Sequence, residues 1–255
     1  MLGIALRYGV GLAELTAANP TVNPNIMSIG TILVIPVSLT PTAAAQVSAE
    51  DVVALTPTAI PVLMHPVTCT RARDGGIWCF QALENNQDIT LESLTGVFHL
   101  RADDGQTRTQ KAALPLDTLP PGASLPLSAY FSPEDSAGVT EPFQVTSELY
   151  TALPNPDDGR YVPSQPQNQK VFISADGLSA EVTLEVELAA DGQQANRVWV
   201  AAVAYDENDQ VAGLRRWEKQ SEQPLVSGET LPVQMQIYSA AGPIQRITVL
   251  TEARP

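Results

Sequence analysis

Basic residues are scarce in this sequence, and their scarcity excludes several classes of partner. Only 14 of the 255 residues are Lys or Arg, against 28 Asp or Glu, which gives a formal net charge of -14. The basic residues form no cluster, so a phosphate backbone is expected to be repelled and nucleic acid is not a predicted partner. The same acidity disfavours docking on an anionic lipid surface.

Long apolar runs are also lacking. No stretch reaches the roughly 18 to 20 apolar residues that cross a bilayer, so no membrane span is predicted. The opening residues, MLGIALR, have neither the basic start nor the length of a signal peptide. The sequence therefore predicts neither a membrane anchor nor a targeting signal in this chain.

Groups that could support catalysis or hold a metal are few. The two histidines, His65 and His99, stand in no metal-ligand spacing with a cysteine or carboxylate. Cys79 with His99 could form a nucleophile pair, but a strand offers no helix N-terminus to activate the thiol, and His99 fits the outer face of a sheet. The acidic turns at 103–105, 155–159 and 206–209 lack a calcium loop and use ordinary turn residues. We expect no enzymatic activity, no cofactor and no metal.

What the sequence does contain is Thr, Ser, Gln and Val, with 21 Pro and 16 Gly, a composition typical of short strands joined by turns. Cys69 and Cys79 flank the turn sequence RDGG at 73–76, which predicts a hairpin with the two cysteines face to face. They form either a disulfide, worth about 2 to 3 kcal/mol in an oxidising compartment, or two reduced, half-buried thiols.

Two stretches of the chain recur. The sequence LPPGASLPL at 119–127 parallels LVSGETLPV at 225–233, and VFHLRADDGQ at 97–106 parallels AAVAYDENDQ at 201–210. The nearly constant spacing indicates a tandem repeat. We predict a mainly β protein with two immunoglobulin-like β-sandwiches, at 61–153 and 170–255, and a proline-rich joint at 154–169. Core packing accounts for at least one tryptophan per repeat, and a sugar-stacking platform is the alternative role for Trp78, Trp199 and Trp217.

The second repeat is similar to the FxLYD family of small extracellular sandwiches. The family signature, a strand ending in Phe-x-Leu-Tyr-Asp and a later Pro-Gly turn, is split between the two repeats. The matching residues are Phe98, Leu100, Tyr205, Asp206, Gly122 and Gly228.

Residues 1–36 have a pattern of apolar residues that differs from the rest of the chain. Apolar residues at 4, 6, 12, 15 and 18 allow two short helices broken at 9–11, and TILVIP at 31–36 predicts a strand stopped by proline. Asn19-Pro20 ends the second helix and Asn23-Pro24 sets a further turn, because the residue before a proline is pushed out of the α region.

This segment resembles the second half of a LysM domain. The positions that agree in register are Ile4-Ala5, Arg7-Tyr8, Val10, Leu15, Asn19, Asn23-Pro24, Ile26, Gly30, Leu33 and Ile35-Pro36. The resemblance implies a small α+β module at 1–37, incomplete because its first strand is missing. We expect an N-terminally clipped chain that has lost a signal sequence with that strand.

In the LysM family a chain of N-acetylglucosamine lies in a shallow groove between two loops. Carried over by position, the resemblance assigns glycan contacts to Leu2, Asn25, Ile26 and Met27. Backbone groups would meet the acetamido group while Ile26 and Met27 cover its methyl. An equal alternative for Ile26 is to close the small core.

The Thr-, Pro- and Ala-rich residues 38–60 form the predicted linker, either with one short helical turn or without structure. The functional expectation is a secreted or cell-surface protein that binds peptidoglycan or chitin without catalysis, its sandwiches acting as spacer or interaction domains. The alternative is a structural or adhesion protein that binds a protein partner through its sandwiches. A wall hydrolase would require a free Cys79.

Overall fold

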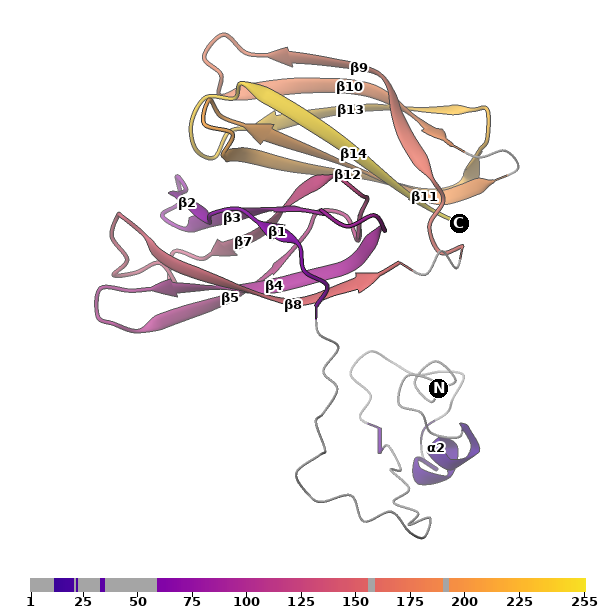
Figure 1. The fold of residues 1–255 in the computed structure, drawn as a ribbon, viewed down its shortest axis with the longest axis horizontal. Coiled ribbons are helices and arrows are strands. Elements are labelled where there is room, and N and C mark those ends of the chain that lie inside the picture. Colours follow the sequence, from indigo (N-terminus) through magenta and orange to yellow (C-terminus); the bar gives the residue numbers. More distant parts are fainter. Residues whose placement is uncertain (1–11, 21, 23–32, 35–58, 156–158, 190–192) are drawn as a thin grey trace. The chain divides into compact units, whose positions relative to one another are not determined.

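The computed structural model describes residues 12–20, 22, 33–34, 59–155, 159–189 and 193–255 (Figure 1). The chain divides into two compact units, Met1–Ala54 and Leu55–Pro255, called here the N-terminal unit and the β unit. The predicted first helix and most of the linker at 38–60 lie outside the described residues. Of the strand predicted at 31–36, the two described residues, Leu33 and Val34, are in no regular element.

In the N-terminal unit the described helix is α2 (Leu12–Ala18). Its sequence, LAELTAA, consists largely of good helix formers. The helix stops before Asn19-Pro20, where it was predicted to end, because the residue before a proline is disfavoured in the α region. Leu15 is fully buried and marks the inward side of the helix.

The β unit is built from antiparallel sheets, which confirms the predicted mainly β, sandwich-type fold. In the first sandwich, β3 is flanked by β2 and β7 with β1 along its end, and β4 is flanked by β5 and β8 with the short β6 beside it. These strands are β1 (Leu63–Met64), β2 (Thr68–Arg71), β3 (Ile77–Glu84), β4 (Leu91–Arg101), β5 (Thr107–Ala113), β6 (Thr118–Leu119), β7 (Ser124–Phe131) and β8 (Gln144–Pro154).

The second sandwich packs the sheet β13-β10-β9 on the sheet β12-β11-β14. Its strands are β9 (Ser164–Ile173), β10 (Ser179–Leu188), β11 (Gln194–Tyr205), β12 (Val211–Val226), β13 (Thr230–Tyr238) and β14 (Arg246–Arg254). In β10, SAEVTLEVEL, every second residue is apolar and buried, as the period of a strand requires.

One predicted boundary differs from the structure. β9 begins at Ser164, within the range predicted as a joint, and includes Pro166. A proline lacks the amide hydrogen that a central strand needs, but β9 lies at the edge of its sheet, where proline is tolerated. The prediction relied on the density of prolines, and it therefore placed the end of the joint at residue 169, after the start of β9.

The two sandwiches share one connectivity. When the two-residue strands β1 and β6 are set aside, β2 pairs with β3 and β3 with β7, as β9 pairs with β10 and β10 with β13. In both sandwiches the next strand, β4 or β11, lies between two further strands. The first sandwich has one additional pair, Ala113 with Ser128, which joins β5 to β7. The recurring sequences fall on equivalent strands, β4 with β11 and β7 with β13. The entering segments also match, since the Ile60 amide donates to the Ala152 carbonyl and the Val162 amide to the Ala253 carbonyl.

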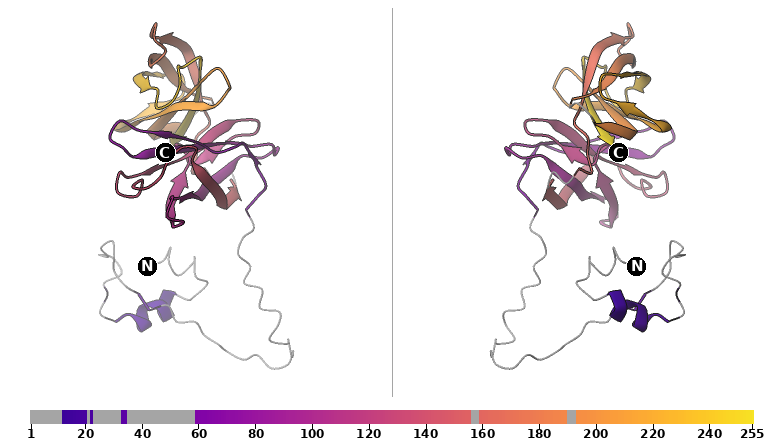
Figure 2. Two further views of the ribbon diagram at one scale, coloured as in Figure 1. Left: turned by 90° about the vertical axis from the view of Figure 1, so that its left-hand side faces the viewer. Right: turned by 90° about the vertical axis from the view of Figure 1, so that its right-hand side faces the viewer.

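β11 is buried on both faces over residues 198–205 and belongs to the cores of both sandwiches. Figure 2 shows the two sandwiches packed against each other in two further views. Val198, Val200, Ala202 and Ala204 belong to the core of the second sandwich. The alternate residues, Trp199, Ala201, Val203 and Tyr205, pack into the core of the first. A strand that faces apolar layers on both sides needs a continuous apolar run, which explains the sequence VWVAAVAY.

Candidate functional site

The glycan-binding residues predicted from the sequence, Leu2, Asn25, Ile26 and Met27, lie outside the described residues. The structure does describe the residues at the two ends of the segment that carries three of them. That segment, residues 20–33, runs from the end of α2 to Val34.

Asn19 ties the two ends of this segment together. Its Nδ2 donates to the carbonyl of Leu15 at 2.8 Å and to that of Val34 at 2.7 Å, and its Oδ1 accepts from the Val34 amide at 2.7 Å. Asn19 is buried, 5% exposed. A buried amide side chain with these partners fixes both the helix end and the start of the next segment, since leaving any of these groups unpaired is costly.

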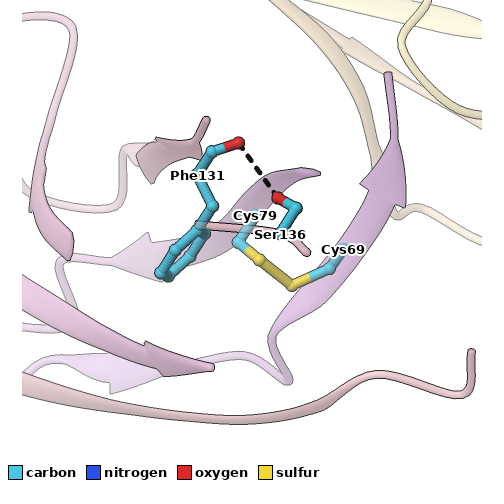
Figure 3. Close-up of a disulfide and its surroundings, with 4 residues drawn as sticks. All are labelled: Cys69, Cys79, Phe131 and Ser136. Atoms are coloured by element: carbon cyan, nitrogen blue, oxygen red, sulfur yellow. Dashed lines mark hydrogen bonds between the residues drawn. A yellow bond between two sulfur atoms is a disulfide. The ribbon is translucent and has the colours of Figure 1, made fainter. Parts of the chain in front are cut away.

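Cys69 and Cys79 are joined in a disulfide (Figure 3). They face each other across β2 and β3 with Cα atoms 4.1 Å apart, as the hairpin predicted. Figure 3 shows the bridge next to Phe131, whose carbonyl accepts a hydrogen bond from Ser136 Oγ at 3.3 Å. The two cysteines are therefore not reduced in this structure, and Cys79 has no free thiol that could serve a hydrolase as nucleophile.

His99 lies on the outer face of β4, where it was predicted. Its Nδ1 is 3.0 Å from Thr109 Oγ1 on β5, and its Nε2 is 3.8 Å from a carboxylate oxygen of Glu148 on β8. These are cross-strand contacts on a sheet surface. They orient the ring within the sheet rather than towards a reacting group.

The three tryptophans do not share a surface. Trp199 is 5% exposed and packs in the core of the first sandwich, while Trp217 is half-buried against the core of the second. Trp78 stands between Phe80 and Tyr130, with ring centroids 5.8 and 5.0 Å away. The single sugar-stacking platform considered from the sequence is therefore not formed by these rings.

Two carboxylates of the acidic turns, Asp104 and Asp206, bond to amides of their own turns, while Asp157 and Asp158 lie outside the described residues. Asp104 accepts from the Gln106 amide at 2.8 Å, and Asp206 accepts from the amides of Asn208 and Gln210 at 2.8 and 2.9 Å. Within the described ranges, no group of three or more His, Cys, Asp or Glu side chains is placed to hold a metal ion.

A buried carboxylate connects the two sandwiches. Glu252 on β14 is 4% exposed, and its Oε2 accepts from the amides of Asp117 and Thr118 at 2.8 and 2.9 Å and from Thr118 Oγ1 at 3.1 Å. Its other oxygen accepts from Arg254 at 3.0 Å. Every oxygen of this buried charge is thus paired, which is the condition for tolerating it.

Arg254 extends this contact. It pairs with Asp117, and its guanidinium lies 4.9 Å from the ring of Trp199 and 4.7 Å from that of Tyr161. Burial works to lower the pKa of Arg254, but Glu252 and Asp117 outweigh it and the pKa is raised. Burial is also the main reason that the pKa of Tyr161 is raised.

A groove of about 580 Å³ runs between the sandwiches. Phe80 and Ala82 of β3 and Leu250 of β14 give it apolar walls. At its rim Arg246 lies 4.1 Å from the ring centroid of Tyr205 and 2.8 Å from Asp209. Apolar walls with a polar rim suit noncovalent binding, but the charged pair at the rim is already internally satisfied.

Sequence reasoning missed the contact between the sandwiches. The available signal was the apolar run at 198–205, which is too continuous for a strand with one solvated face. The paired Glu252 gave no signal, because its partners are backbone amides more than a hundred residues away.

Comparison with protein-family models and with curated proteins finds no match to the chain. None of the helices among the described residues has the length and apolar character needed to cross a membrane. The disulfide is compatible with an extracellular protein.

Proposed function

We propose that the protein is a non-enzymatic, secreted or cell-surface protein that binds N-acetylglucosamine polymers, peptidoglycan or chitin, through a LysM-like N-terminal unit. The two FxLYD-like sandwiches act as its spacer or interaction domain. The observation that carries this proposal is the Asn19 clamp, which joins α2 to Val34 and so fixes the ends of the segment that bears Asn25, Ile26 and Met27.

The chemistry of the proposed ligand suits the chain. N-acetylglucosamine is neutral, so the net charge of -14 does not repel it. Its acetamido group needs a donor and an acceptor, which backbone groups and Asn25 supply, and an apolar cover for the methyl, which Ile26 and Met27 supply. Association with the cell wall follows from the same ligand.

Co-sedimentation with insoluble peptidoglycan and chitin tests the proposal. The chain should be retained by at least one of them, and the double substitution Asn25→Ala with Met27→Ala should abolish retention. The matched control replaces an exposed asparagine and methionine of the first sandwich, Asn86→Ala with Met64→Ala, and should leave retention unchanged. Absence of retention on both polymers, or retention that the Asn25/Met27 variant does not reduce, contradicts the proposal.

Binding of a protein partner through the sandwiches is the second candidate function, with an inert N-terminal unit. It is favoured by one observation, the exposed apolar side chains at the free edge of the second sandwich.

A further inference from the structure

Four large apolar side chains that are exposed in the described part of the chain gather at one end of the sheet β13-β10-β9. They are Phe172 at 72% exposure, Tyr238 at 68%, Leu178 at 46% and Val171 at 38%, called here the β9 patch. Phe172 is opposite Glu181 and Tyr238 opposite Ser179, so both rings rise from the outer face on either side of β10. The Ser239 amide donates to the Leu178 carbonyl, which holds Leu178 close to Tyr238.

β9 is also an open edge. In the part of the chain that the structure describes, it pairs with β10 along one side and with no strand along the other (Figure 1). Its first residue still contacts β14, since Ser164 Oγ lies 2.9 Å from Thr251 Oγ1, so the open stretch is the end that carries Val171 and Phe172. Val171 is opposite the fully buried Val182 and so belongs to the inward series, yet it remains 38% exposed. Near Phe172 the outward side chain is therefore exposed and the inward one, Val171, is only partly covered, as at a strand that lacks a neighbour.

The equivalent edge of the first sandwich is not left open in this way. β2 is tied to β3 by the disulfide, and Thr70 Oγ1 donates to the Ala240 carbonyl of the second sandwich at 3.1 Å. Arg71 donates to the Val139 carbonyl at 2.5 Å. The same strand position thus contacts the neighbouring sandwich in one repeat and carries an exposed apolar patch in the other.

The outer face beside the β9 patch is acidic. Glu181, Glu185 and Glu187 project from β10 in one row, and Lys170 is the basic residue of β9. A second copy of the chain would bring a further net charge of -14 to this face. A segment that carries Lys or Arg complements it.

We infer that the β9 edge binds an extended segment of a partner protein in which apolar residues alternate with Lys or Arg. The segment adds as a strand beside β9, and its backbone pairs with the open edge. Its apolar side chains point to the inward face and cover Val171, while its Lys or Arg side chains point to the outer face, lie over Phe172 and reach towards Glu181. This binding is independent of the glycan proposed for the N-terminal unit.

Selection from a displayed library of random ten-residue peptides on the immobilised full chain tests the inference. Enriched peptides should alternate apolar and basic residues, and Phe172→Ser should weaken their binding at least tenfold. The control Tyr150→Ser removes an aromatic ring that is 54% exposed on β8, another edge strand, and should change nothing. Glu181→Lys should shift the selected peptides from basic to acidic, a reversal that loss of folding would not produce.

Other results overturn the inference. Absence of enrichment, or peptides that bind the Phe172→Ser variant equally well, would show that β9 is not the site. Dimerisation in sedimentation equilibrium that depends on Phe172 would assign the patch to a second copy. Retention on chitin or peptidoglycan that depends on Phe172 and Tyr238 would assign it to a glycan.

Discussion

At the scale of single residues, two buried polar side chains do the same physical task in different parts of the chain. Asn19 and Glu252 each satisfy backbone groups of a segment distant in sequence. Each therefore fixes a geometry that apolar packing alone would leave loose, because an unpaired buried polar group is costly.

Asn19→Ala should destabilise the N-terminal unit by roughly 2 to 3 kcal/mol, since the Val34 amide and the Leu15 and Val34 carbonyls lose their partner. Hydrogen exchange of the Val34 amide should become faster. Asn19→Asp keeps the acceptor for that amide and should protect it better than alanine does. Equal protection of Val34 in the native protein and the alanine variant would disprove the clamp.

Glu252→Ala leaves the amides of Asp117 and Thr118 and the charge of Arg254 without their partner. Removal of one member of a buried pair costs about 3 to 5 kcal/mol, and we expect a loss of that size in denaturant unfolding of the β unit. Glu252→Gln retains an acceptor and should lose less. A loss below about 1 kcal/mol for alanine would contradict the bridging role.

Asp74 and Tyr130 form a surface pair whose titration can be followed. The hydrogen bond from Tyr130 lowers the pKa of Asp74 below 3.8, and the same bond raises the pKa of Tyr130 above 10.0. The contribution of Asp74 to stability is thus present above its unfolded pKa and lost as the pH falls through its folded one. The contribution of Tyr130 to stability is present below its unfolded pKa of 10.0 and is lost as the pH rises through its folded pKa. Tyr130→Phe should return the pKa of Asp74 towards 3.8 in an NMR titration, and an unchanged value would contradict the pairing.

At the scale of elements, the first and second sandwiches treat their outer strands differently. β2 is short and held by the disulfide, while β9 has ten residues and an uncovered end. Reduction of the disulfide, or the double substitution Cys69→Ala with Cys79→Ala, should cost about 2 to 3 kcal/mol. Hydrogen exchange of β2 amides should accelerate while that of β10 amides is unchanged. Equal acceleration in both strands would show that the bridge does not act locally.

Elements with a strict local signal could be predicted from the sequence. The hairpin around 73–76, the end of the helix at Asn19-Pro20 and the alternating strands at 179–188 all follow from neighbouring residues. The fold class follows from their sum. The seam between the sandwiches could not be predicted, because the hydrogen bonds of Glu252 and the burial of Trp199 depend on partners far away in sequence. The predicted glycan residues stay predictions, since they lie outside the described residues.

At the scale of the whole molecule, the two sandwiches pack on each other, and we expect them to unfold together rather than as two independent domains. β11 contributes to both cores, and Glu252 and Arg254 cross the seam. A single cooperative transition is therefore expected for the β unit in calorimetry. Trp199→Ala should cost about 3 to 5 kcal/mol and separate the transition into two. Tyr150→Ala, at an exposed ring, should leave one transition, and two transitions in the native β unit would contradict the shared core.

The central claim is that glycan binding resides in the N-terminal unit. The most direct test is an NMR titration of the isotope-labelled chain with soluble N-acetylglucosamine oligomers. We predict shifts confined to amides of Met1–Ala54, strongest around Asn25 to Met27, with the amides of Leu55–Pro255 unchanged. Shifts centred on the sandwiches, or no shift at saturating oligomer, would contradict the claim.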